Sequence, residues 1–477
     1  MKREIIFPAG MWPALKTYLF DQGPKEQLAF LLAGWARGRT RLRLLVREFI
    51  PVAPAALDRH TSVSLAVKPA FSQAVLQRCY EEGLGLIEVH SHPFAPHEVT
   101  FSATDLANEA DKFRYVARKI PHVCHATMVV GQADLDAHLW DPRTRRTVPI
   151  DQVRALDAPI VDLWPTSRSR SSDHDDTLGE WLDRQVLAFG EAGQRRLQRV
   201  RVGVVGCGGT GAAVVQLLAH LGVRDLVLVD PDIVEQSNLN RLVGATLADA
   251  RQGRLKVHVA RRLAQRINPA AQVRALPVPL KDRRAVAALK EVDQLFGCTD
   301  NHGSRLLLNQ LSVQYLIPYL DLGTGLHAAS DGSLTAAGGQ IRLVRPGDFC
   351  LACIDGIDRT LAARDLMSPL AHRRAVARGY VQDADMPTPA VLFLNSTVAS
   401  LAIAEFVSLW TGYRDTSPLL YFDLLHLRLT PATANREASC IACGEGRSLA
   451  LGDLEPLPMA VSTEPPDTIP ASESTRG

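Results

Sequence analysis

The chain has 477 residues, more than one ordinary hydrophobic core accommodates, so two or three domains are expected. Hydrophobic residues make up 46% of it and charged residues 22%, which is typical of globular proteins. The net charge of +2 gives no strong field that would indicate nucleic acid or a membrane as partner. We expect no apolar run of membrane-spanning length, and the first ten residues lack the long apolar segment of a secretion signal.

Four domains or segments are expected in chain order. Residues 1–150 resemble a compact α/β unit, and residues 181–450 a second, larger α/β unit. Residues 151–180 contain a polar, turn-rich run and are interpreted as a linker, with 451–477 as a disordered tail rich in Pro, Ser, Thr and Glu. The apolar segments of the first unit that are expected to be buried or to form strands are 27–34, 42–52, 84–90, 126–131 and 136–140.

The cysteines indicate metal binding rather than a disulfide scaffold. Four of the eight form two Cys-x-x-Cys pairs, at Cys350/Cys353 and Cys440/Cys443, and each pair could supply two thiolates to a tetrahedral zinc ion. Four unrelated buried cysteines are a weaker interpretation, because both spacings are identical. This usage indicates a reducing compartment, so a cytoplasmic location is expected.

A glycine-rich turn opens the second unit. A β-branched strand leads into the turn, and a helix and a second strand follow, ending in Asp230. The glycines are Gly206, Gly208, Gly209 and Gly211. Backbone N–H groups and the helix N-terminus attract phosphate in such a βαβ unit, and the acidic residue after the second strand commonly holds a ribose. By the glycine pattern alone, a dehydrogenase would be the favoured interpretation.

The residues that follow favour adenylation instead. The run Ser-Asn-Leu-Asn-Arg at 237–241, Lys256, and Cys-Thr-Asp-Asn at 298–301 resemble the adenylation domain of the ThiF and ubiquitin-activating enzymes, over roughly 180–450. The resemblance implies a Rossmann-like fold that uses ATP and Mg²⁺ to activate a carboxyl terminus. Adenylation needs cations and a metal carboxylate because negative charge builds on the phosphates, whereas hydride transfer does not. Arg241 and Lys256 as solvated surface charges would be the alternative for either residue alone.

The resemblance also implies individual roles. Asp230 would bind ribose, Asn238, Arg241 and Lys256 would hold the phosphates, and Asp300 would bind Mg²⁺. Arg184 matches a family arginine that reaches the phosphates of the partner subunit, which implies a homodimer. Leu242 departs from the family, which usually has Gln after the Arg.

The resemblance implies that the four paired cysteines hold a structural zinc, far from the chemistry. Many relatives also place a nucleophilic cysteine between the two pairs, but Asp355 to Ser439 contains none. The chain is therefore expected to stop at the acyl-adenylate, to transfer it directly, or to use a hydroxyl such as that of Thr388. A threonine in a turn is the plainer interpretation of Thr388.

The first unit carries a separate motif between Glu88 and Asp105. His90, His92, Ser102 and Asp105 follow a strand in the order of the JAMM signature, and the segment resembles the JAB/MPN metallopeptidases. The resemblance implies a catalytic zinc on His90, His92 and Asp105, with one position left for water. Ser102 would bind that water or the developing oxyanion.

The general base is the least constrained member of this motif. Glu26 is the candidate, and Glu48 is next in line. The loop from His92 to Ser102 is long, and Phe101 stands where a proline is usual. The plainer interpretation of the whole segment is a proline-stapled loop with incidental histidines.

Together these motifs predict a fusion of a JAB/MPN-like metallopeptidase and an adenylating enzyme. Such a chain would adenylate the C-terminal glycine of a ubiquitin-like or sulfur-carrier protein and would also cut that protein, in a bacterial conjugation pathway. A conjugating enzyme is a further possible partner, and neither nucleic acid nor membrane is expected. The alternatives are carrier activation for cofactor sulfur metabolism, and a non-catalytic module that docks ubiquitin-like tails.

Overall fold

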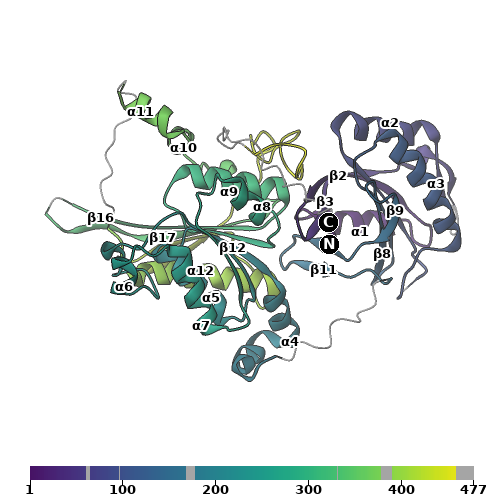
Figure 1. The fold of residues 1–477 in the computed structure, drawn as a ribbon. Coiled ribbons are helices and arrows are strands. Elements are labelled where there is room, and N and C mark those ends of the chain that lie inside the picture. Colours follow the sequence, from purple (N-terminus) through teal and green to yellow (C-terminus); the bar gives the residue numbers. More distant parts are fainter. Residues whose placement is uncertain (61–64, 96, 168–177, 330, 378–388, 458–477) are drawn as a thin grey trace, which may run out of the picture.

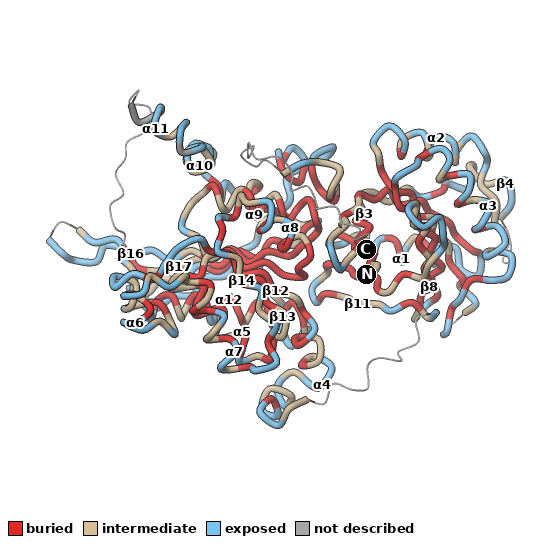
Figure 2. The backbone as a smooth tube through the Cα atoms, in the orientation of Figure 1, coloured by how far each residue is buried: buried red, intermediate tan, exposed pale blue. Residues whose placement is uncertain are grey.

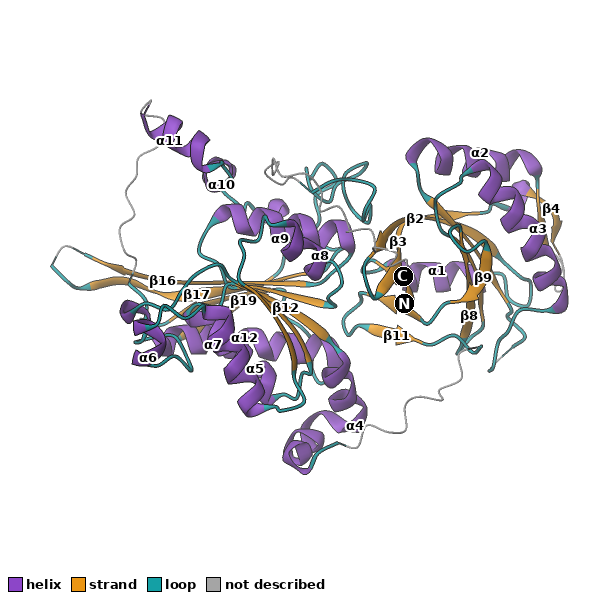
Figure 3. Cartoon of the chain, viewed as in Figure 1, coloured by secondary structure: helices purple, strands orange, loops and turns teal. Residues whose placement is uncertain are grey.

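The computed structural model describes the chain except for residues 61–64, 96, 168–177, 330, 378–388 and 458–477. Two large sheets dominate it, each flanked by helices (Figure 1, Figure 3). The backbone that is buried concentrates in the strands of the two sheets, whereas the outer helices expose one side (Figure 2). The α/β class expected from the sequence is confirmed for both halves.

The first half is built on a nine-stranded mixed sheet with the order β11-β10-β1-β3-β2-β6-β7-β8-β9. Its strands are β1 (Lys2–Phe7), β2 (Leu28–Arg37), β3 (Arg41–Pro51), β6 (Gly85–Ser91), β7 (His125–Val130), β8 (Leu135–Asp141), β9 (Arg146–Pro149), β10 (Gln152–Ala155) and β11 (Val161–Leu163). A short hairpin of β4 (Leu57–His60) and β5 (Leu65–Val67) stands apart. Each of the five apolar segments expected from the sequence coincides with one of these strands.

Helices close both faces of this sheet. On one face α1 (Met11–Phe20) buries Trp12, Leu15 and Leu19 against the strands. On the other face lie α2 (Pro69–Glu82) and α3 (Ala103–Lys119), and a short 3-10 turn spans Pro54–Ala56. Helix α3 begins where it does because Ser102 and Asp105 form a reciprocal capping box.

The second half is built on an eight-stranded sheet with the order β14-β13-β12-β15-β16-β17-β18-β19. The first five strands are parallel and the last four pair antiparallel, with β16 shared. The strands are β12 (Arg201–Val205), β13 (Asp225–Val229), β14 (Gln272–Leu276), β15 (Gln294–Gly297), β16 (Tyr319–Ala328), β17 (Leu334–Val344), β18 (Leu419–Asp423) and β19 (Arg428–Ala432).

Helices cover both faces of the second sheet, as in a Rossmann-like fold (Figure 1). The helices are α4 (Asp183–Arg199), α5 (Gly209–His220), α6 (Leu247–Arg251), α7 (Lys256–Ile267), α8 (Arg283–Leu289), α9 (His302–Tyr315), α10 (Arg359–Asp365), α11 (Pro369–Ala377) and α12 (Leu392–Thr411). Short 3-10 turns span Glu180–Leu182, Gln236–Asn238 and Leu351–Ile354.

Helix α12 corrects one expectation. Its 20 residues are long and apolar enough to cross a membrane by length and composition alone, although no run of that kind was expected. Val398, Phe406 and Trp410 of this helix are fully buried in the core of the second half. The run is apolar because α12 is a core helix, packed against α5 and against the strands β16 and β17.

The first half also extends further than the sequence indicated. Strands β10 and β11 lie within the segment interpreted as a linker, yet β10 pairs in parallel with β1. The remainder of that segment includes 168–177, which lies outside the described residues, as does the predicted tail from 458 onward. The first residues of that predicted tail are ordered: Gly452 bridges to Trp35, and Asp453 accepts a hydrogen bond from the Arg37 N–H at 2.8 Å.

Candidate nucleotide and metal sites

The carboxyl ends of β12, β13 and β15 border a cavity of about 1420 Å³. The cavity is lined by residues from the loops that follow these three strands, and it continues over β16, β17 and β18. An open parallel sheet binds ligands at this edge, because the loops and helix N-termini converge there.

The glycine turn lies against this cavity in a conformation that only glycine adopts freely. Gly206 has a φ of 88°, and Gly208 is the N-cap of α5. Gly206, Gly208 and Gly209 line the cavity, but Gly211 does not. A Cβ on Gly211 would lie 1.8 Å from the Gly206 carbonyl oxygen, so Gly211 permits close packing of helix on loop rather than contact with a ligand.

Asp230 is buried behind the turn and holds it in place. Its carboxylate accepts the Cys207 N–H at 2.6 Å and the Asp232 N–H at 2.8 Å. Burial raises the pKa of Asp230, although these two hydrogen bonds act in the opposite direction. Asp230 also lines the cavity, in the position where an acidic side chain reaches a ribose.

The expected cations and the expected magnesium carboxylate surround the same cavity. Arg241, Lys256 and Asp300 all line it. The Lys256 ammonium lies 2.8 Å from a carboxylate oxygen of Asp232, and Arg241 donates to the Ser237 carbonyl at 2.8 Å. Positions 59 residues apart in the chain, from Arg241 to Asp300, therefore meet at one site.

Two expected residues lie outside the lining. The Asn238 side chain caps its own 3-10 turn by accepting the Glu235 N–H at 3.2 Å. Arg184 lies exposed on α4 and is not among the described residues that line the cavity of its own chain. Their phosphate roles stay predictions. Thr388 lies outside the described residues.

Leu242, the departure from the family pattern, has a structural explanation. It is 4% exposed and packs with Ala212, Val234 and Val259 in a small apolar cluster beside the cavity. An apolar side chain fits this position because its neighbours are all apolar.

Sequence reasoning missed Arg305, which lines the cavity from α9. The guanidinium donates to the buried Asp321 carboxylate at 3.3 Å, and Arg342 binds the other oxygen of the same carboxylate at 2.9 Å. Its position four residues after Asn301, on the helix that the Cys-Thr-Asp-Asn loop begins, is the signal that could have indicated it.

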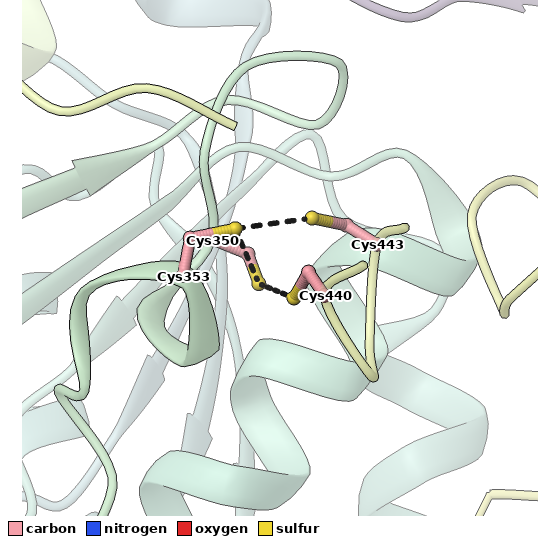
Figure 4. A group of neighbouring side chains, drawn as sticks. All are labelled: Cys350, Cys353, Cys440 and Cys443. Atoms are coloured by element: carbon pink, nitrogen blue, oxygen red, sulfur yellow. Dashed lines mark hydrogen bonds between the residues drawn. The ribbon is translucent and has the colours of Figure 1, made fainter. Parts of the chain in front are cut away.

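The two Cys-x-x-Cys pairs converge although 90 positions separate them (Figure 4). The Sγ–Sγ distances are 3.9 Å for Cys350–Cys353, 3.7 Å for Cys350–Cys440 and 3.4 Å for Cys353–Cys443. A tetrahedral zinc with Zn–S bonds of about 2.3 Å places its sulfurs roughly 3.8 Å apart. The four thiols therefore fit a structural zinc site.

A second group of potential ligands lies in the first half, at the end of β6. Ligand atoms of His90, His92 and Asp105 all lie within 4.8 Å of one another. The Nε2 atoms of both histidines are 3.6 Å from an Asp105 oxygen, beyond hydrogen-bond length but near the roughly 3.3 Å expected between ligands of a tetrahedral zinc. Among the described residues, the buried Nε2 of His90 has no hydrogen-bond partner, which fits a nitrogen that binds a metal.

The charges around this group suit its expected chemistry. Burial works to raise the pKa of Asp105, but the neighbouring His90, His92 and Ser102 outweigh it and lower that pKa well below its ordinary value. Glu26 lies 3.9 Å from His92 Nε2, and burial raises the pKa of its carboxyl. A carboxylate with a raised pKa is a better proton acceptor near neutral pH.

Ser102 and Glu48 are placed differently from Glu26. The Ser102 hydroxyl oxygen accepts the Asp105 N–H at 3.1 Å, so its own O–H can still donate to another group. Glu48 is bound by both terminal nitrogens of Arg78, at 2.9 and 2.7 Å, and this hydrogen bonding lowers the pKa of its carboxyl. Glu48 is therefore the poorer candidate for a base.

Known relatives match the second half. The ThiF family model matches residues 182–442. The probable adenylyltransferase/sulfurtransferase MoeZ of Mycobacterium tuberculosis is 40% identical over 132 residues, 28% of this chain and 33% of MoeZ. The sulfur carrier protein adenylyltransferase of Thermus thermophilus is 40% identical over 124 residues, 26% of this chain and 45% of that protein.

The molybdopterin-synthase adenylyltransferase of Escherichia coli is 28% identical over 272 residues, which cover 55% of this chain and 95% of that enzyme. The chain spans less than half the length of MoeZ and of the Thermus thermophilus protein. Residues 1–181 lie outside the family match. Because that match covers more than half of the sequence, the chain belongs to the ThiF family.

Proposed function

We propose that the second half adenylates the C-terminal carboxylate of a ubiquitin-like or sulfur-carrier protein. The observation that carries this proposal is the cavity at the edge of the parallel sheet, where Arg241, Lys256 and Asp300 accompany the glycine turn. Three of the relatives are adenylyltransferases by name, which supports the same reaction.

In the proposed reaction the carrier carboxylate attacks the α-phosphorus of ATP, an acyl-adenylate forms, and pyrophosphate leaves. Arg241 and Lys256 would stabilise the negative charge that develops on the phosphates. Asp300 would hold Mg²⁺, which neutralises charge on the leaving pyrophosphate. Asp230 would orient the nucleotide through its ribose.

The far part of the cavity suits an extended peptide tail. Gly323 and Gly325 of β16, which pairs with β17, line it there, and a Cβ at Gly325 would meet only His327 Nε2, at 3.7 Å. Glycines leave room for another backbone to approach closely. We propose that the carrier tail lies along these strands with its carboxylate toward Arg241.

Pyrophosphate exchange with a candidate carrier tests the adenylation. Asp300→Ala is expected to abolish carrier-dependent exchange with no change in the circular dichroism spectrum, because the magnesium carboxylate is lost. Asp415→Ala, which removes an exposed carboxylate from the same half, is the matched control and should leave exchange unchanged. Normal exchange in Asp300→Ala would remove Asp300 from the site.

We propose in addition that the first half is a zinc-dependent peptidase for the same kind of protein. The geometry of His90, His92 and Asp105, with Glu26 beside them, supports this proposal. When bound, zinc lowers the pKa of water enough for attack on an amide near neutral pH. Glu26 would take the proton and pass it to the leaving amine, and the Ser102 O–H would donate to the developing oxyanion.

Zinc counting and cleavage of a ubiquitin-like fusion by the full-length chain test the peptidase. Glu26→Gln should keep two zinc ions per chain but lose cleavage, because an amide of the same shape does not take the proton. Glu48→Gln, its matched control, should cleave like the parent. Equal cleavage by Glu26→Gln and the parent would exclude Glu26 as the base.

A homodimer is proposed because Arg184 is exposed on α4 and lies outside its own cavity. The exposed Trp181 and Leu187 beside it offer apolar surface to a second copy. A monomeric mass at micromolar concentration, together with full adenylation activity, would refute the dimer.

Two alternative functions would each be favoured by a particular observation. The lack of a cysteine between Asp355 and Ser439 favours carrier activation for sulfur transfer over conjugation, because no thioester nucleophile stands there. A carrier thiocarboxylate formed in the presence of a sulfur donor would support that alternative. Absence of any pyrophosphate exchange would favour the second alternative, a non-catalytic module that docks ubiquitin-like tails.

A further inference from the structure

The candidate metal site of the first half is assembled from two separate elements. His90 belongs to β6 and His92 follows that strand directly, whereas Asp105 stands in the first turn of α3. The strand and the residue directly after it hold the two histidines in register, but the third ligand depends on where α3 lies against the sheet. The position of this helix therefore decides whether three ligands converge.

One buried carboxylate fastens α3 to the sheet. Glu109 stands one turn after Asp105 and is only 7% exposed. Its Oε2 atom accepts the Thr127 hydroxyl of β7 at 2.7 Å and lies 3.0 Å from Nδ1 of His138 on β8. A carboxylate is costly to bury unless it is hydrogen-bonded, so its presence here indicates a specific attachment rather than general packing.

Aromatic contacts connect the Glu109–His138 pair to the potential metal ligand His90. The His138 ring stacks on Phe101 with centroids 4.5 Å apart, and Phe101 in turn lies 6.3 Å from the His90 ring. Phe101 also directly precedes Ser102, the N-cap of α3. Burial opposes a charged His138, but the Glu109 carboxylate outweighs it and raises the pKa of His138 above its ordinary value.

We propose that Glu109 is the positioning residue of the metal site: it fixes α3 on β7 and β8, so that Asp105 meets His90 and His92. This proposal rests on the proposed metal site of the first half. Glu109 is not one of the three potential ligands, and it acts through the helix that carries Asp105. Lys112, one turn further along, pairs with Glu88 of β6 and supports the same placement.

Titration of the full-length chain with Co²⁺ tests the proposal without relying on activity. The ligand-field absorption of Co²⁺ reports the coordination at the site, and the His92→Ala variant is subtracted to remove any Co²⁺ taken by the four cysteines. Glu109→Ala should weaken Co²⁺ binding about 10- to 100-fold and alter the absorption band, as the loss of a supporting partner does in other metal sites. Glu109→Gln should bind nearly as well as the parent, because an amide oxygen in the place of Oε2 can accept from both the Thr127 hydroxyl and the Nδ1–H of His138.

Asp111→Asn is the matched control, since Asp111 lies on the same helix with 82% of its side chain exposed. Parental affinity and absorption in Glu109→Ala would overturn the proposal. If Glu109→Ala does not fold, Thr127→Val carries the test, because it removes one hydrogen bond and keeps the shape; unchanged binding there would equally overturn it. If the parent and His92→Ala titrate identically, the proposed metal site itself is wrong.

Discussion

Replacing Asp293 with asparagine should destabilise the whole chain, because this carboxylate joins its two halves. Three arginines of the first half converge on it: the nitrogens of Arg41, Arg43 and Arg154 lie 2.5, 3.0 and 2.6 Å from Oδ1. The Asp293 and Arg43 side chains are each only 2% exposed. Asparagine keeps the size of the side chain but removes the charge that these guanidinium groups share.

The burial of Asp293 and its arginine partners determines how much stability the substitution removes. An exposed ion pair contributes about 0–1 kcal/mol, whereas removal of one partner from a buried pair costs about 3–5 kcal/mol, because the remaining charge stays out of water. Glu4 and Asp162 lie beside the same arginines and compensate in part, at 3.0 Å from Arg43 and 2.6 Å from Arg154. We therefore expect a loss near 3 kcal/mol in the free energy of unfolding.

Urea denaturation followed by circular dichroism at pH 7 measures this loss. Burial works to raise the pKa of Asp293, but the three arginines outweigh it and hold the pKa well below its ordinary value. A depressed pKa contributes stability that is complete above the pKa of the unfolded state, about 3.9, and disappears as the pH falls through the folded pKa. The difference in the free energy of unfolding between the parent and Asp293→Asn should accordingly stay constant from pH 8 to pH 5. It should shrink only in stronger acid.

Asp415→Asn is the control, since it removes an exposed carboxylate from the same half. A midpoint for Asp293→Asn that equals that of the parent would refute the reasoning, because it would mean that water reaches the arginines. A difference in the free energy of unfolding that already disappears between pH 8 and pH 5 would also refute the reasoning.

Three further outcomes follow from the site geometry. Leu242→Gln, which restores the residue usual in the family, should cost about 1–3 kcal/mol in urea denaturation, because it buries an amide in an apolar cluster. Gly211→Ala should abolish ATP binding measured by calorimetry, since its methyl group would lie 1.8 Å from the Gly206 carbonyl oxygen. Peptidase kcat/KM should rise with pH through the raised pKa of Glu26, with its acid limb above the ordinary range of a glutamate; an acid limb below that range would contradict Glu26 as the base.

Several features of this protein could be predicted from the sequence because they depend on residues close together in the chain. The glycine turn between β12 and α5 is one, since strand, turn and helix occupy a single short segment with a local conformational requirement. The capping box of Ser102 and Asp105 is equally local, since they stand only three positions apart, although the sequence indicated these two residues only as members of the zinc site. The spacing within each cysteine pair indicated a zinc site for the same reason.

The tertiary structure decided which distant segments meet. Strand β10 joins β1 across 148 positions, for example from Glu4 to Gln152, because an unpaired edge beside β1 was available to it. Asp293 meets its arginines, and Glu109 meets His138, only after strands from distant parts of the chain have packed together. No local pattern marks such partners, because a buried charge is stabilised by whatever folds against it and not by its neighbours in sequence.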